Sequence, residues 1–177
     1  GDYREMLDKE QPDFVDVCSW HQMHAEMVIA AAARGPKAIL CQKPMAVDLR
    51  EADDMLTACA RNNVKLIIAY QRPHHAVWLR ARELVREGVI GKISQVQMAC
   101  GGNLLNTNSH NIRLALFMMD EPEVEWVVGA VERTTELVER GLPAEDACMG
   151  VAGCANGASI LIMGNLVGGL GQGCRII

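Results

Sequence analysis

The sequence is poor in aromatic residues and has no excess of positive charge. Only 4% of its 177 residues are aromatic, and 17 Lys and Arg stand against 22 Asp and Glu, which gives a formal charge of −5. A nucleic-acid surface needs clustered basic side chains to neutralise phosphates, so this balance argues against a nucleic-acid partner. Trp20, Trp78 and Trp126 are scattered along the chain, which favours core packing over a platform for stacked bases.

Long apolar runs are also missing. No run approaches the roughly 20 residues that a bilayer-spanning helix needs, and no basic segment followed by an apolar one opens the chain. The sequence therefore predicts no association with a membrane. A chain of this length is long enough to bury a core, either as one domain or as two small ones.

The seven cysteines form no Cys-x-x-Cys pair, and several lie inside apolar runs. This distribution favours buried free thiols in a reducing cytoplasm over a disulfide or zinc framework. His21 and His24 share one face of a predicted helix, so a metal site has to be considered. No third ligand follows at metal spacing, and we therefore expect no metal.

Strands and helices alternate in the first part of the chain. Strands are predicted at residues 13–18, 37–41 and 64–70, and helices at 3–7, 21–34 and 48–62, the last with Asp48 and Glu51 at capping-box spacing. Alternation of this kind predicts an α/β fold with a parallel sheet covered by helices.

The pattern changes in the region of residues 72–92. Helices are predicted at 76–87 and 109–119, strands at 93–100, 123–131, 147–154 and 158–166, and a hairpin turn at Ala155-Asn156-Gly157. We expect a second, α+β domain with a mostly antiparallel open sheet. The glycine run at 168–173 lacks the strand–turn–helix context of a phosphate loop, so a turn or bulge is the better interpretation.

Three segments follow directly on predicted parallel strands, at residues 19–24, 42–44 and 71–75. Ligands of open parallel sheets bind at the carboxyl ends of the strands, so these segments should converge on one edge. Lys43 is the only lysine among them, and partial desolvation would suit it to chemistry. From spacing alone, an ordinary solvated loop lysine is the simpler interpretation.

His110 is the second candidate. It opens a predicted helix after the polar loop at 106–109, at the end of a strand of the second domain. A histidine in this place could act as a general base near neutral pH. A structural histidine bonded to the backbone at a helix start is an equally good interpretation.

Several motifs, in this order, resemble the Gfo/Idh/MocA family of NAD(P)-dependent oxidoreductases, which act on sugars, inositols and related polyols. They are Asp16-Val17-Cys18-Ser19-Trp20 with His24, residues 39–46 with Gln42-Lys43-Pro44, residues 88–91, and the spacing from Asn106 to His110. The resemblance spans nearly the whole chain. It implies that residues 1–72 are the C-terminal part of a Rossmann dinucleotide-binding domain, and that residues 73–177 are an incomplete domain for substrate binding and oligomerisation.

The resemblance also implies roles for individual residues. Lys43 would stabilise the substrate alkoxide or relay its proton, and His110, oriented by Asn106, would remove the hydroxyl proton. The nicotinamide side of NAD or NADP would be lined by Ser19, Trp20, His24, Gln42, Lys43, Pro44 and Gln71. A homo-oligomer through the sheet of the second domain is a further implication.

The sequence departs from the family pattern in three ways. The glycine-rich turn and the acidic ribose-binding residue, which precede this region in the family, are absent, Gln42 replaces the usual Glu, and Asn106 replaces the usual Asp. Two other hypotheses therefore stay open: a non-catalytic relative that binds a sugar-like ligand, and an oligomerisation module. The helical start and the apolar end, Arg175-Ile176-Ile177, lead us to expect a piece of a longer protein that binds cofactor poorly by itself.

Overall fold

The structure is a computed structural model that describes residues 1–166 and 173–177. It divides into two compact units, Gly1–Tyr70 and Gln71–Ile177, close to the boundary at residue 72 that the sequence predicts. Each unit has its own buried apolar cluster, so each is described by itself. Among the described residues, no helix is long and apolar enough to cross a membrane.

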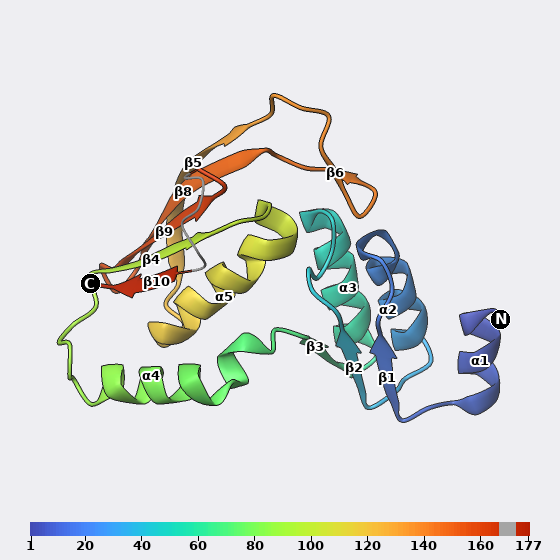
Figure 1. The fold of residues 1–177 in the computed structure, drawn as a ribbon. Helices are drawn as coiled ribbons and strands as arrows, with labels where there is room; N and C mark the ends of the chain where they lie inside the picture. The colour runs from blue at the N-terminus through green and yellow to red at the C-terminus, as the bar shows by residue number, and fades with distance from the viewer. Residues whose placement is uncertain (167–172) are drawn as a thin grey trace. The chain divides into compact units, whose positions relative to one another are not determined.

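The first unit is built on a parallel sheet with the strand order β1-β2-β3 (Figure 1). Its elements are α1 (Tyr3–Glu10), β1 (Phe14–Val17), the 3₁₀ turn η1 (His21–Met23), α2 (His24–Ala32), β2 (Ala38–Cys41), α3 (Leu49–Arg61) and β3 (Lys65–Ile68). This arrangement confirms the predicted α/β half. The predicted helix at 21–34 is divided, because its first turn is 3₁₀ and its regular part ends at Ala32.

The start of α3 is fixed by its local sequence. The Asp48 carboxylate accepts a hydrogen bond from the Glu51 N–H at 2.8 Å, and the Glu51 carboxylate accepts one from the Val47 N–H at 3.2 Å. The predicted capping box is thus confirmed, except that Glu51 bonds the residue before the cap. At the end of α2, Gly35 has a φ of 69°, which lets the chain turn into β2.

Small side chains let α2 pack closely on the sheet. Val28 and Ala32 of α2 are fully buried, as are Ile39 of β2 and Met55 of α3. Burying a side chain the size of Val, Ile or Met contributes about 1.5–3 kcal/mol, so these residues hold the helices in place over the strands.

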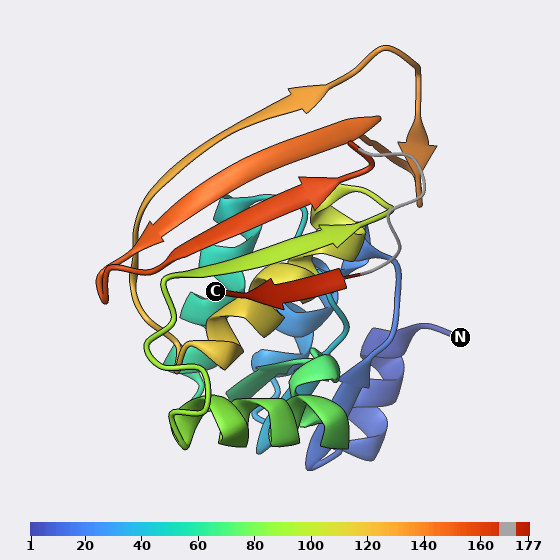
Figure 2. The same ribbon diagram turned by 60° about the vertical axis from the view of Figure 1, so that its left-hand side comes forward.

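The second unit is built on a five-stranded sheet with the strand order β10-β4-β9-β8-β5 (Figure 2). Its elements are η2 (Arg72–His74), α4 (Ala76–Arg86), β4 (Gln95–Cys100), η3 (Leu104–Asn108), α5 (Ser109–Met118), β5 (Val124–Glu132), β6 (Val138–Glu139), β7 (Leu142–Pro143), β8 (Ala147–Cys154), β9 (Ser159–Gly164) and β10 (Gly173–Ile176). All neighbours in the sheet are antiparallel except the pair β4 and β9. The expected mostly antiparallel sheet is therefore confirmed.

Helix α5 lies against β4 and β9 and covers one face of the sheet. Leu114 and Met118 of α5 pack against Val96, Met98 and Ile160 in the second core. The predicted hairpin between β8 and β9 is also confirmed: Gly157 takes a φ of 85° in the turn, a value that glycine adopts without strain. Strand β5, at one edge of the sheet, is exposed along its whole length.

Two expectations about burial were wrong. Trp20 and Trp126 are 59% and 52% exposed, and only Trp78 packs against a core. Trp126 lies on a strand edge, where its ring fits over Gly153 because that residue has no side chain. All seven cysteines are free thiols, but Cys18 is exposed because it follows the last buried position of β1.

Tertiary packing also created elements that the sequence pattern did not reveal. The stretch expected to be a loop before His110 is the π-helical turn η3, and the short strands β6, β7 and β10 were missed. Most of the glycine run at 168–173 lies outside the described residues, and Gly173 begins β10.

Candidate functional site

In the first unit, the carboxyl ends of the three parallel strands lie in register. Val17, at the end of β1, pairs with Cys41, at the end of β2, and Cys41 pairs with Ile68 of β3. The backbone N–H of Gln42 continues the ladder by donating to the Val17 carbonyl at 3.0 Å. The segments that begin at Ser19 and Gln42 therefore leave the same edge of the sheet, as predicted for these two of the three segments. The third segment, residues 71–75, belongs to the second unit.

His24 joins these two segments. Its Nδ1 lies 2.9 Å from the Pro44 carbonyl oxygen, and its Nε2 lies 3.2 Å from the Ser19 carbonyl oxygen. The ring has no exposed surface. A neutral imidazole donates its single N–H to one of the two oxygens, and an imidazolium donates to both. In either state, His24 fixes the loop after β1 to the loop after β2.

We expect His24→Ala to lower the free energy of unfolding by about 2–4 kcal/mol, because it leaves a cavity and two carbonyls without their partner. His24→Asn places an amide nitrogen near the position of Nδ1 and should recover part of the loss. Urea unfolding followed by circular dichroism measures both values. His75→Ala, at an exposed histidine, is the control. A loss below about 0.5 kcal/mol for His24→Ala would rule out this bridging role.

The residues around Lys43 offer polar groups next to apolar surface. Gln42 and Lys43 are partly buried and Pro44 is buried, whereas the Trp20 side chain is exposed. Ser19 is partly buried, and its hydroxyl donates to the Trp20 carbonyl at 3.4 Å. This edge can therefore hold a flat, partly polar group, with a cationic side chain beside it.

The thiol beside Gln42 is not a candidate nucleophile. Burial raises the pKa of the Cys41 thiol to about 12, with the nearby Asp16 carboxylate as a smaller cause. Since the thiolate is the reactive form, Cys41 stays protonated and unreactive near neutral pH. This leaves Lys43 as the candidate for chemistry in the loop after β2.

In the second unit, the start of α5 is polar and yet buried. Asn106, Asn108, His110 and Asn111 are each at most 9% exposed. Asn103 caps the turn η3, because its side-chain oxygen accepts from the Asn106 N–H at 2.8 Å. Buried polar groups are costly unless they are hydrogen-bonded, so such a concentration at one helix start is typical of a functional site. π-Helical turns are also frequent at such sites.

Side-chain amides fix the geometry of this helix start. The Asn111 amide nitrogen donates to the Asn108 side-chain oxygen at 3.1 Å and lies 2.8 Å from the Cys100 sulfur. The Arg72 guanidinium donates to the Asn111 side-chain oxygen at 2.8 Å. Burial raises the pKa of the Cys100 thiol, so this cysteine acts as a neutral partner in the network. Together these bonds hold the turn of α5 on which His110 lies.

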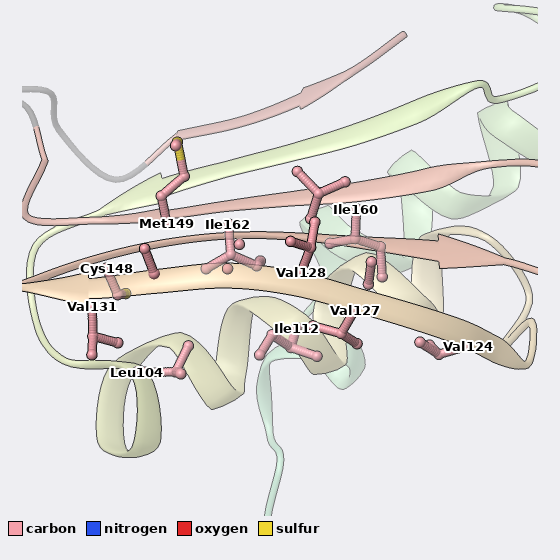
Figure 3. Close-up of a pocket in the computed structure, with 15 residues that line it drawn as sticks. Leu104, Ile112, Val124, Val127, Val128, Val131, Cys148, Met149, Ile160 and Ile162 are labelled. Atoms are coloured by element: carbon pink, nitrogen blue, oxygen red, sulfur yellow. The ribbon is translucent and has the colours of Figure 1, made fainter.

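A hollow in the second unit has a different character. It encloses about 360 Å³ between β5, β8 and α5, where Ile112 and Val127 both border the space (Figure 3). Its lining is aliphatic apart from Cys148, Met149 and backbone. A polyol needs hydrogen-bonding partners for each hydroxyl, so this hollow does not suit one.

His21 and His24 do not form a metal site. Their ring centroids are 5.9 Å apart, but both nitrogens of His24 already face backbone carbonyls. Within the described part of the chain, no group of three or more His, Cys, Asp or Glu side chains is placed to hold a metal ion.

Comparison with known proteins supports the Rossmann-type fold of the first unit. Residues 1–70 match the model of a family described as "Oxidoreductase family, NAD-binding Rossmann fold". The chain is 29% identical over 140 residues to the myo-inositol 2-dehydrogenase of Thermotoga maritima, covering 71% of this chain and 41% of that protein. Residues 1–70, which make up the first unit, are thus similar to the Gfo/Idh/MocA oxidoreductase family.

Two further proteins are similar to this chain, one in sequence and one in fold. It is 41% identical over 91 residues to the D-apiose dehydrogenase of Paraburkholderia graminis, covering 51% of this chain and 24% of that protein. Its fold matches an inositol dehydrogenase homologue from Azotobacter vinelandii, solved with NADH and myo-inositol, at a TM-score of 0.83 and 21% identity. That match covers 99% of this chain and 52% of the other, so the chain spans about half the length of its relatives.

The structure brings the predicted site residues into two groups. Ser19, Trp20, Gln42, Lys43 and Pro44 lie along one edge of the first sheet, tied together by the buried His24. Gln71 is exposed and opens the second unit, which also contains Asn106 and His110.

Sequence reasoning missed two acidic residues that bond the turn before His110. The carboxylate of Glu139 accepts from the Asn106 side chain, and that of Glu145 accepts from the Leu104 N–H. Both lie in or near the β6–β7 hairpin, more than 30 residues from the turn. No local sequence pattern could have pointed to them.

Proposed function

We propose that this protein is an NAD(P)-dependent oxidoreductase that transfers a hydride between a nicotinamide cofactor and a hydroxyl or ketone of a sugar, inositol or related polyol. The main support is Lys43, which is partly buried and lies two residues after the end of β2, at the edge where parallel sheets bind ligands. Relatives named as myo-inositol and D-apiose dehydrogenases support this class of substrate.

The residues at this edge suit the nicotinamide end of NAD or NADP. A partly exposed apolar surface with Trp20 beside the polar groups of Ser19 and Gln42 matches a flat ring with a carboxamide. When bound, the nicotinamide supplies the acceptor or donor of the hydride. We propose that Ser19, Trp20, Gln42, Lys43, Pro44 and Gln71 contact the cofactor. His24 has no exposed surface, so its proposed part is to hold the two loops.

Oxidation of an alcohol removes a proton from oxygen and a hydride from carbon. We propose that His110 is the general base that accepts this proton. His110 is buried and is the second residue of α5. The ammonium group of Lys43 stabilises the negative charge that develops on the oxygen. Asn106 orients the base. In the reverse direction, the same groups return the proton to the oxygen of a ketone.

Titration of the intact natural protein with NAD and NADP tests this proposal. Trp20 is exposed, so cofactor binding nearby should change the tryptophan fluorescence. We then expect polyol-dependent formation of reduced nicotinamide, followed by its absorbance, with myo-inositol and aldopentoses as first substrates. Binding of neither cofactor would contradict the proposal and favour a non-catalytic relative that binds a sugar-like ligand.

We also propose that a second copy of the chain covers the outer face of the five-stranded sheet. Leu161, Val151 and Val128 form a row across β9, β8 and β5 on the face opposite to the buried Ile160 and Ile162. Val128 is 63% exposed, and covering such a row would remove apolar surface from water.

The free thiols support a reducing compartment, and we assign the protein to the cytoplasm.

A further inference from the structure

A carboxylate reaches the turn before His110 from a distant part of the second unit. The side-chain amide nitrogen of Asn106 donates a hydrogen bond to Glu139, which lies in the hairpin formed by β6 and β7. Asn106 is 9% exposed and Glu139 is partly buried, so water screens this pair less than a surface pair.

The bond determines which way the amide of Asn106 points. An ionised carboxylate only accepts hydrogen bonds, so the amide nitrogen has to face Glu139, and the amide oxygen faces the other side. Without Glu139, the two ends of the amide could exchange places by rotation of the side chain. The carboxylate therefore leaves the Asn106 oxygen as the acceptor toward the rest of the turn.

Asn106 and His110 are four residues apart along the continuous helical path of η3 and α5. Side chains at this spacing lie on the same side of a helix. An oriented acceptor and a nearby negative charge are what a general base needs to hold one tautomer and to stabilise its protonated form. An asparagine at position 106 provides the acceptor but not the charge.

We propose that Glu139 is a positioning residue for the reaction of His110: it fixes the amide of Asn106 and supplies the negative charge that an asparagine at position 106 cannot. This inference rests on the proposed function, in which His110 is the base. The β6–β7 hairpin would then contribute a residue to the site, although no local motif of the sequence indicates this.

Exchanging the two chemical groups tests the inference. Glu139→Gln removes the charge and leaves two amides facing each other, and Asn106→Asp sets two carboxylates against each other. We expect each single change to lower kcat by about tenfold in the intact natural protein, with little change in the KM for the cofactor. The double variant, Asn106→Asp with Glu139→Gln, restores one acid and one amide and should return kcat to within about threefold of wild type.

The control is Glu136→Gln, which removes an exposed carboxylate from the same segment and should leave kcat unchanged. Thermal unfolding of all variants shows whether a loss of kcat follows from a loss of fold. Wild-type turnover by Glu139→Gln, or a double variant no better than the poorer single variant, would overturn the role of Glu139 while leaving the proposed function intact. Absence of dehydrogenase activity in the wild-type protein would overturn both.

Discussion

Lys43→Ala in the intact natural protein is expected to lower the turnover of a polyol substrate by about 10²–10⁴-fold. The substitution removes the cation that we assign to the developing alkoxide, and it leaves the loop after β2 attached to His24 through the Pro44 carbonyl. The loss should appear in kcat, measured from the formation of reduced nicotinamide, because the charge on the substrate oxygen develops only as the reaction proceeds.

Lys37→Ala provides the matched control. This lysine lies in the same unit, is exposed, and has its ammonium nitrogen 3.0 Å from a carboxylate oxygen of Asp13. Exposed ion pairs contribute little, so the variant should keep wild-type turnover and stability. Near-normal turnover by Lys43→Ala would remove Lys43 from the mechanism, and an equal loss in both variants would point to a general effect of charge.

His110→Ala is expected to reduce kcat by a similar factor, about 10²–10⁴-fold, since it removes the general base. Cofactor binding, followed by fluorescence, should stay close to wild type because the proposed cofactor contacts lie elsewhere in the sequence. The variant leaves a cavity at a position that is only 7% exposed. Imidazole added to the assay should therefore restore part of the activity, which a purely structural histidine would not allow.

Arg113→Gln is the control on the same helix. The Arg113 side chain is partly exposed and pairs with Glu121 near the surface, so its loss should not affect kcat. If His110→Ala bound cofactor normally and also turned over substrate at the wild-type rate, the assignment of the base would be wrong. Loss of both binding and turnover, with a lower melting temperature, would instead identify His110 as a structural residue.

Much of the fold follows from local patterns. The β1, α2, β2, α3 and β3 series is visible as apolar runs separated by caps and glycine, and the β8–β9 hairpin as an Asn-Gly turn. Such features depend on interactions between residues close in sequence, which the sequence displays directly. Strands β6 and β7 are two residues long and have no pattern of their own, so only their pairing defines them.

Part of the candidate site also follows from the sequence, and part does not. The order of strands and loops along the chain is enough to place Ser19, Gln42 and Lys43 on one edge, because parallel strands align their carboxyl ends. The link from His24 to the Ser19 and Pro44 carbonyls was not visible, although His24 itself was noted. A hydrogen bond between a side chain and a distant backbone oxygen cannot be predicted from the sequence, because every residue has a backbone oxygen.

The sequence by itself determined the family resemblance, the parallel sheet and the residue types at the candidate site, since these depend on periodicity and on short motifs. Only the tertiary structure decided that the turn before His110 is buried and π-helical, and that Glu139 faces Asn106. Burial and long-range pairing are properties of the folded chain, set by which surfaces pack together. They bring together residues such as 106 and 139, whose separation along the chain hides their contact.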